Sequence, residues 1–229
     1  MNLSLPFVGR KKEIAELQRL LFQRKHALIL GSAGIGKSAL VAHLHQCQSM
    51  IVCAQSETLG GICDRLEIEL NSPAPHLPLV RRKNRLIKIL AEAWRTVVFD
   101  GVGWTTPKVS SFFGSVMERV PIWICARSEL APNIGHFWPL LARFEKVELR
   151  PFRFSETNAL LNAAVESGQV PPSAEPYARQ LHRLSGGLPR ALLELLEQFA
   201  ASHYDLSRRT GLQLLELDRR IKNLPSLAV

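Results

Sequence analysis

The chain has 229 residues, of which 46% are hydrophobic and 21% are charged, and 29 Lys and Arg against 20 Asp and Glu give a net charge of +9. A chain of this length and composition can bury the core of one large domain, or of a domain with a small appendage, which excludes a disordered protein. The positive charge favours polyanionic partners: a nucleotide, a nucleic acid or an acidic protein.

Five short apolar runs alternate with helical patterns over the first 150 residues. They cover residues 26–30, 50–54, 96–100, 121–126 and 146–149. Parallel strands need crossovers and bury both faces, so five such strands separated by helices predict a parallel α/β sheet. From residue 151 onward the pattern is helical. We therefore expect an α/β domain over 1–150 and a small helical domain over 151–229.

The stretch directly after the first run, GSAGIGKS, satisfies G-x-x-x-x-G-K-[ST] and leads into a helical pattern. Glycines let backbone N–H groups curl around a phosphate, and the helix that follows adds its positive end. Lys37 would bridge the β- and γ-phosphates of a nucleotide, and the Ser38 hydroxyl would ligate Mg²⁺. The expected phosphate contacts are Gly31, Ser32, Ala33, Gly34, Ile35, Gly36, Lys37, Ser38 and Ala39.

Polar residues end two of the later runs. Asp100 closes the run VVFD, where it would hold Mg²⁺ directly or through water; the alternative is a cap on the following segment. Arg127 and Ser128 follow PIWICA, where they could sense a γ-phosphate; the alternative is ordinary surface polarity.

The remaining patterns bear on the location of the chain. The four cysteines lack the spacing of a metal site, so we expect buried, reduced thiols. The N-terminus lacks the apolar core of a signal peptide, and no apolar run approaches the roughly 18 residues that span a bilayer. These patterns predict no membrane partner and a cytoplasmic location.

With these motifs, residues 6 to 200 resemble the AAA+ ATPases and their relatives, the signal-transduction ATPases with numerous domains (STAND), which include the NB-ARC and NACHT proteins. The resemblance implies a three-layer P-loop NTPase with a parallel sheet of order 5-1-4-3-2, followed by a small helical lid. It also implies that ATP and Mg²⁺ are the ligands.

Three segments carry further roles by resemblance. PFVGRKKEIAELQRLL is similar to the N-terminal motif that lies near the adenine. LARFEKVELRPF is similar to the segment whose arginine reaches a neighbouring subunit's nucleotide, and SGGLPRALLELL is similar to the lid motifs of both groups. The resemblance implies that Phe7, Val8, Gly9 and Arg10 contact the adenine base. Arg143 would be an arginine finger, which contacts the neighbouring subunit's nucleotide, or else a surface charge. Pro189 and Arg190 would lie on the lid.

The chain also departs from these families. Gly101 stands where AAA+ members usually have the Glu that orients the attacking water, and Gly103 stands where NACHT proteins supply an acid. We therefore expect slow or partner-dependent hydrolysis. About 27 residues follow Ser202, so we expect no winged-helix domain of the kind that many relatives have after the lid.

Three functions fit these features. The first is a switch whose ATP or ADP state controls association with other copies or with a partner protein. The second is a DNA-binding helper ATPase of the kind found in transposition or replication, and the third is a relic that has lost nucleotide binding. The run VRRKNRLIK supports the second through Arg81, Arg82, Lys83, Arg85 and Lys88, with a solvated helix face as the alternative.

Overall fold

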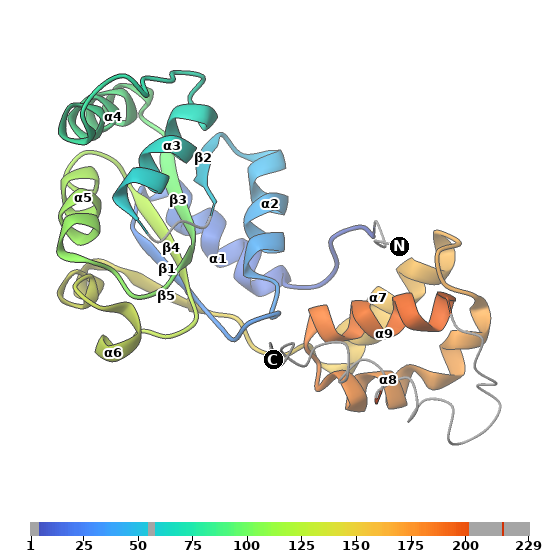
Figure 1. Cartoon of the computed structure of the whole chain (residues 1–229). Helices are drawn as coiled ribbons and strands as arrows, with labels where there is room; N and C mark the ends of the chain where they lie inside the picture. The colour runs from blue at the N-terminus through green and yellow to red at the C-terminus, as the bar shows by residue number, and fades with distance from the viewer. Residues whose placement is uncertain (1–4, 55–57, 202–216, 218–229) are drawn as a thin grey trace, which may run out of the picture. The chain divides into compact units, whose positions relative to one another are not determined.

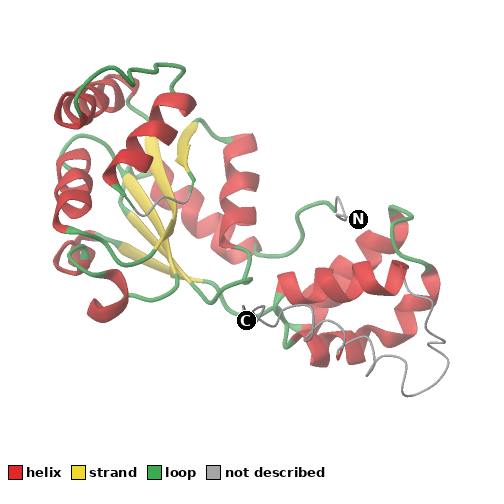
Figure 2. Cartoon of the chain, in the orientation of Figure 1, coloured by secondary structure: helices red, strands yellow, loops and turns green. Residues whose placement is uncertain are grey.

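A computed structural model describes residues 5–54, 58–201 and 217 of the chain (Figure 2). The chain divides into two compact units. One is Arg10–Leu149, and the other joins Met1–Gly9 to Arg150–Val229.

The first unit is built on a five-stranded sheet in which all paired neighbours are parallel (Figure 1). The order β2-β3-β4-β1-β5 is the predicted order read from the opposite edge, so that prediction is confirmed. The strands are β1 (Ala27–Leu30), β2 (Met50–Cys53), β3 (Thr96–Val102), β4 (Ile122–Ala126) and β5 (Glu145–Glu148).

Helices cover both faces of this sheet, which makes the predicted three-layer architecture (Figures 1 and 2). On one face a large apolar core, centred on Phe99, Phe112 and Phe113, joins strand residues to α3, α4 and α5. Strand residues alternate between faces, so Ile29, Val98 and Trp123 are buried toward the other layer. The helices are α1 (Lys11–Phe22), α2 (Lys37–Cys47), α3 (Leu59–Glu69), α4 (Leu79–Ala93), α5 (Pro107–Met117), α6 (Ala131–Ile134) and the 3₁₀ helix η1 (Trp138–Arg143).

The edge strand β5 is charged on its exposed positions. Val147 is buried, whereas Glu145, Lys146 and Glu148 are exposed. The Lys25 ammonium lies 2.9 Å from the Glu145 carboxylate, and Lys146 pairs with Glu129. Both ion pairs tie this edge to neighbouring segments.

The second unit is helical over its described C-terminal part. Its core gathers Leu161, Leu181 and Leu192, and Leu5 and Val8 from the start of the chain pack against it. The helices are α7 (Phe154–Glu166), the 3₁₀ helix η2 (Pro172–Tyr177), α8 (Ala178–Ser185) and α9 (Pro189–Ala201). Leu5 and Val8 therefore pack with the helical unit rather than with the sheet.

Candidate functional site

The loop between β1 and α2 has the backbone of a phosphate cradle. Gly36, the residue before α2, has a φ of 98°, in the region that favours glycine. A Cβ on Gly31 would lie 2.8 Å from the Ile35 side chain and 3.0 Å from the Leu149 carbonyl. Close packing and backbone shape therefore both require glycine in this loop.

The loop is anchored on one side and open on the other. The Ile35 side chain is 1% exposed, whereas Ser32, Ala33, Ser38 and Ala39 are exposed. The first N–H groups of an α-helix have no partner within the helix, and the first turn of α2 carries no acidic side chain. This arrangement suits an anion at the N-terminus of α2.

The ammonium group of Lys37 lies folded over the loop. Its Nζ donates to the carbonyl oxygens of Gly31 at 2.6 Å and Ser32 at 3.0 Å. Burial lowers the pKa of Lys37, whereas the Cys125 thiol and the Asp100 carboxylate act to raise it. The pKa of Lys37 therefore responds to the charge of Asp100 as well as to burial.

Asp100 lies where β3 leaves its regular pairing with β4. The register shifts between Phe99 and Val102, and Gly101 has a φ of 72°. Such a bulge re-aims the side chain beside it. Burial raises the pKa of the Cys125 thiol, and Asp100 raises it further by its charge and a hydrogen bond, so the two side chains are in contact.

The polar residues after β4 have different surroundings. Arg127 is exposed at the end of β4, and its charge adds to the lowering of the Lys37 pKa. Ser128 Oγ accepts hydrogen bonds from the Leu130 N–H at 3.1 Å and from Asn133 Nδ2 at 3.0 Å. Arg127 therefore lies beside the loop, whereas Ser128 holds the turn that follows β4.

The predicted adenine segment is divided between the two units. Val8 packs on the helical core, and a Cβ on Gly9 would lie 3.0 Å from the Glu156 carboxylate. Phe7 is half-buried. Arg10 begins the other unit, where its side chain is 4% exposed and donates to the Ile35 carbonyl at 2.9 Å and to Glu13 at 3.3 Å.

The predicted lid residues start α9. Pro189 is its first residue. The Arg190 side chain is 72% exposed, and its guanidinium donates to Glu194 at 3.0 Å. Just before them, a Cβ on Gly187 would lie 2.5 Å from the Phe152 carbonyl, so this turn packs tightly on the start of the unit.

Arg143 lies at the opposite end of the sheet from the phosphate loop. It precedes β5, and its guanidinium donates to Glu118 at 2.7 Å, with both side chains exposed. Burial lowers the pKa of His26, which precedes β1, and the Arg143 charge lowers it further. The phosphate loop follows the four residues of β1, about 13 Å away at roughly 3.3 Å per residue. If Arg143 contacts a nucleotide, that nucleotide would therefore be bound to another copy of the chain.

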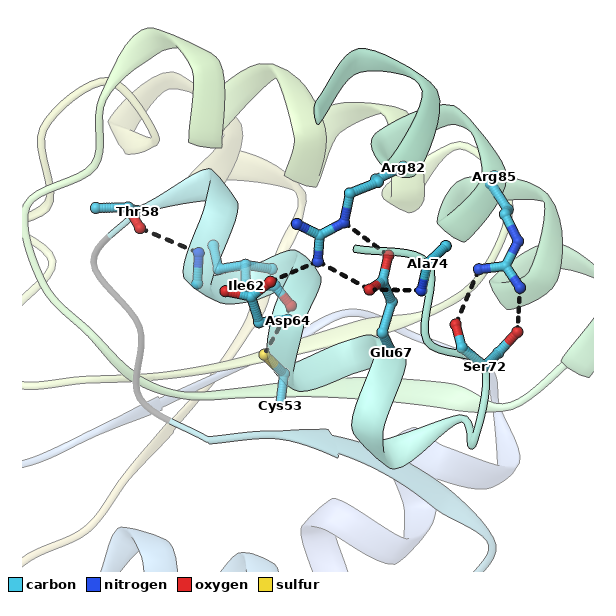
Figure 3. Close-up of polar contacts among 10 residues, drawn as sticks. Cys53, Thr58, Ile62, Asp64, Glu67, Ser72, Ala74, Arg82 and Arg85 are labelled. Atoms are coloured by element: carbon cyan, nitrogen blue, oxygen red, sulfur yellow. Dashed lines mark hydrogen bonds and ion pairs between the residues drawn. The ribbon is translucent and has the colours of Figure 1, made fainter. Parts of the chain in front are cut away.

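The basic run lies on α4, as predicted, but several of its side chains are engaged within the chain (Figure 3). Arg82 donates to both carboxylate oxygens of Glu67 at 2.8 Å and also pairs with Asp64, while Glu67 accepts from the Ala74 N–H. The remaining contacts join Arg85 to Ser72 and Lys83 to Ser111. Arg81 and Lys88 are exposed.

Two features of the described residues bear on metals and membranes. No group of three or more His, Cys, Asp or Glu side chains is placed there to hold a metal ion. Mg²⁺ at Ser38 and Asp100 would therefore need phosphate oxygens and water as further ligands, which Mg²⁺ commonly uses. None of the helices described is long and apolar enough to cross a membrane.

The chain matches no model of a protein family and no curated protein. It does resemble solved structures. The Cdc6p protein of Pyrobaculum aerophilum has a TM-score of 0.67 and 16% identity, over 85% of this chain and 63% of that one. The Aeropyrum pernix ORC1 protein, solved in complex with DNA, has a TM-score of 0.65 and 14% identity, over 96% and 70%.

This chain has the fold of the AAA+ P-loop ATPases. A STAND protein of Pyrococcus horikoshii with a tetratricopeptide repeat sensor shares that fold, with a TM-score of 0.56 and 17% identity, over 96% of this chain and 33% of that one. The chain spans under two thirds of the Cdc6p protein. At these identities the likeness concerns the AAA+ fold alone.

Two contacts around the loop between β1 and α2 have no signal in the sequence motifs. Arg10 reaches the loop from 25 residues away, and Cys125 touches Asp100 from a neighbouring strand. Alternation along PIWICA indicates which face Cys125 takes, but the partner across the sheet depends on the strand register.

Proposed function

We propose that the chain is an ATP-binding switch of the AAA+ and STAND type whose nucleotide state controls association with other copies or with a partner protein. The observation that carries the proposal is the glycine-shaped loop after β1, where the Lys37 ammonium lies over the loop carbonyls beside an open helix N-terminus. Lys37 would neutralise the β- and γ-phosphates. Ser38 and Asp100 would hold Mg²⁺, which supplies positive charge against the phosphate oxygens.

The groups around the site suit retention of ATP better than rapid hydrolysis. Gly101 and Gly103 follow Asp100 without a side chain to hold an attacking water. Loss of a positioned general base costs about 10² to 10⁴ in rate. ATP would therefore persist as a ligand, with Arg127 as a candidate γ-phosphate sensor.

Thermal unfolding with Mg²⁺ and ATP tests this proposal. A ligand that binds only the native state stabilises it by about 2.7 kcal/mol at a hundredfold excess over Kd. Lys37→Ala should abolish the rise in Tm, whereas Lys108→Ala, an exposed lysine on α5, should retain it. An equal rise in all three proteins would refute the assignment of the site.

A DNA-binding helper ATPase is the second candidate. The net charge of +9 and the exposed Arg81 and Lys88 support it, and the similar ORC1 protein was solved in complex with DNA. Its weakness is that Arg82 and Arg85 are engaged within the chain. Duplex binding that is lost in the Arg81→Gln/Lys88→Gln double variant at about 50 mM salt would favour it, since each phosphate contact contributes to a salt-dependent affinity.

A further inference from the structure

A cationic and an aromatic side chain are stacked at the amino end of the sheet. The Arg24 guanidinium carbon lies 4.0 Å from the centre of the Trp94 ring. The same guanidinium donates to the Trp94 carbonyl at 3.1 Å. The pair joins the end of α1 to the end of α4 and holds the indole in one orientation.

Both residues adopt a backbone conformation that usually favours glycine. Arg24 has a φ of 53° and Trp94 a φ of 54°. Each follows a helix at the position where glycine relieves this strain. Strained non-glycine residues are concentrated at functional sites in proteins, and here two such residues are in contact.

The aromatic groups here are unusually open. Trp94 is 64% exposed although the Arg24 guanidinium covers one side of its ring, and Phe22, two residues before Arg24, is 90% exposed. The indole therefore presents solvent-accessible ring surface at a fixed position.

Several basic residues lie in the segments at this end of the sheet. Glu16, Glu118 and Glu145 pair with Arg19, Arg143 and Lys25 respectively. Arg24 forms no ion pair with any described residue. The side chains of Arg95 and Arg119 form neither a hydrogen bond nor an ion pair with any described residue. Arg95 and Arg119 lie in the segments that lead into the adjacent strands β3 and β4, where the Val97 N–H donates to the Pro121 carbonyl. Glu92, near the end of α4, offsets one of these three positive charges.

We propose that this amino-end surface, formed by Phe22, Arg24, Trp94, Arg95 and Arg119, binds single-stranded nucleic acid. A base would stack on the open part of the Trp94 ring, and the guanidinium groups of Arg24, Arg95 and Arg119 would neutralise phosphates. Aromatic platforms flanked by cations bind single strands in this way without reading sequence. The surface lies at the end of the sheet away from the phosphate loop, so the proposal does not depend on nucleotide binding.

The chemistry favours a nucleic acid over an acidic protein. The apolar groups are two rings set among arginines, and stacking on one ring is enough to hold a base. A protein partner would need a larger buried surface, on the order of 800 Å² on each side. A fixed indole ring suits the stacking of a base, whereas attraction of an acidic protein by charge alone would not need the ring.

Fluorescence anisotropy with labelled oligothymidylate and oligouridylate of about 16 nucleotides tests the proposal on the whole chain. We expect binding at about 50 mM salt that weakens as salt rises. Trp94→Leu should raise the Kd about 5- to 150-fold, the equivalent of the ~1–3 kcal/mol of one stacked base. The preferred oligonucleotide distinguishes DNA from RNA.

Matched variants separate binding from folding. Trp138→Leu, at a tryptophan that is 53% exposed on η1, should leave the Kd unchanged. Trp94→Gly relieves the strained backbone, so it should weaken binding while its Tm stays at or above that of the unmodified chain. Arg119→Gln should weaken binding, whereas Arg19→Gln, at a paired arginine, should not.

Three results would overturn the proposal. One is the absence of oligonucleotide binding at low salt. Another is an unchanged Kd in both Trp94 variants. The third is tighter binding of polyglutamate than of either oligonucleotide, which would indicate an acidic protein partner instead.

Discussion

The guanidinium of Arg10, almost wholly buried, donates a hydrogen bond to the backbone carbonyl of Ile35 inside the phosphate loop, 2.9 Å away. The contact ties the first residue of the α/β unit to the loop that follows its central strand β1. Ile35 is in turn the loop residue whose side chain is buried. The shape of the loop therefore depends on a residue outside the loop motif.

The first prediction concerns this contact. Arg10→Met leaves the Ile35 carbonyl without its guanidinium partner, which should cost about 1–3 kcal/mol of unfolding free energy. The affinity for ATP should fall as well, because the loop loses its support. Urea unfolding and ATP titration measure the two effects, with Arg19→Met on the exposed side of α1 as control. Equal unfolding free energies and equal ATP affinities in the two variants would show that Arg10 does not support the loop.

The second prediction concerns hydrolysis. Gly103 has open space around its Cβ position, whereas Gly101 has a φ of 72° that strains any L side chain. Gly103→Glu should therefore keep the Tm of the unmodified chain and raise single-turnover hydrolysis at least about tenfold, since a positioned base contributes about 10² to 10⁴.

Gly101→Glu is the matched variant. It places the same acid at a position where the backbone costs about 1–3 kcal/mol, so the Tm should fall. If the unmodified chain turns over at about 1 s⁻¹, as ordinary enzymes do, and Lys37→Ala abolishes this, another residue acts as base and this interpretation of β3 is wrong.

The third prediction concerns the buried pair of Glu67 and Arg82 (Figure 3). Glu67→Gln leaves the Arg82 charge partly uncompensated and should cost on the order of 3 kcal/mol. Asp64→Asn, whose carboxylate is 61% exposed, should cost less than about 1 kcal/mol. Chemical denaturation at neutral pH measures the unfolding free energy of both variants. Similar decreases would show that the buried pair stabilises the fold no more than the exposed pair does.

The same pair makes stability depend on pH. The hydrogen bonds from Arg82 lower the pKa of Glu67 from its ordinary value of 4.5. The stability that Glu67 contributes is therefore fully present above that value and is lost as the pH falls through the lowered pKa. Between pH 5 and pH 3 the unmodified chain should lose more stability than Glu67→Gln. An equal loss of unfolding free energy in the two proteins over this pH range would contradict this prediction.

The fourth prediction concerns self-association. Arg143 pairs with Glu118 at an exposed site, where such a pair is worth at most about 1 kcal/mol, so the guanidinium is released at little cost. With a non-hydrolysable ATP analogue, sedimentation should show association that is lost in Arg143→Ala. It should be retained or strengthened in Glu118→Ala. A monomer at high concentration in all three proteins would exclude Arg143 as a finger.

Local patterns in the sequence predicted much of the fold. Strand burial and the loop motif are short-range features, and they placed β1 to β5 and the residues Gly31 to Ser38 close to where the structure has them. The apolar run also predicts Asp100 at the end of a buried strand; in the structure Asp100 lies in β3 two residues before its end, at the register shift. The sheet order followed from family resemblance.

Long-range contacts could not be predicted in the same way. Arg82 occupied one place in a basic run, yet its carboxylate partner lies 15 residues earlier on another helix. The bulge at Gly101 depends on how β3 pairs with β4, and nothing in VVFDGV reports that register. Trp94 is exposed, and nothing in the sequence around it indicates this, because exposure depends on which helices surround the residue.

The charged edge strand β5 limits how copies of this chain can meet. An unpaired strand edge invites another chain to extend the sheet through backbone hydrogen bonds, the route that leads to fibrils. Alternating charges at Glu145, Lys146 and Glu148 oppose such an extension, because a docking strand would have to strip water from them. Association along β5 is thereby disfavoured, so copies that assemble in response to a nucleotide would do so through side chains and could separate again.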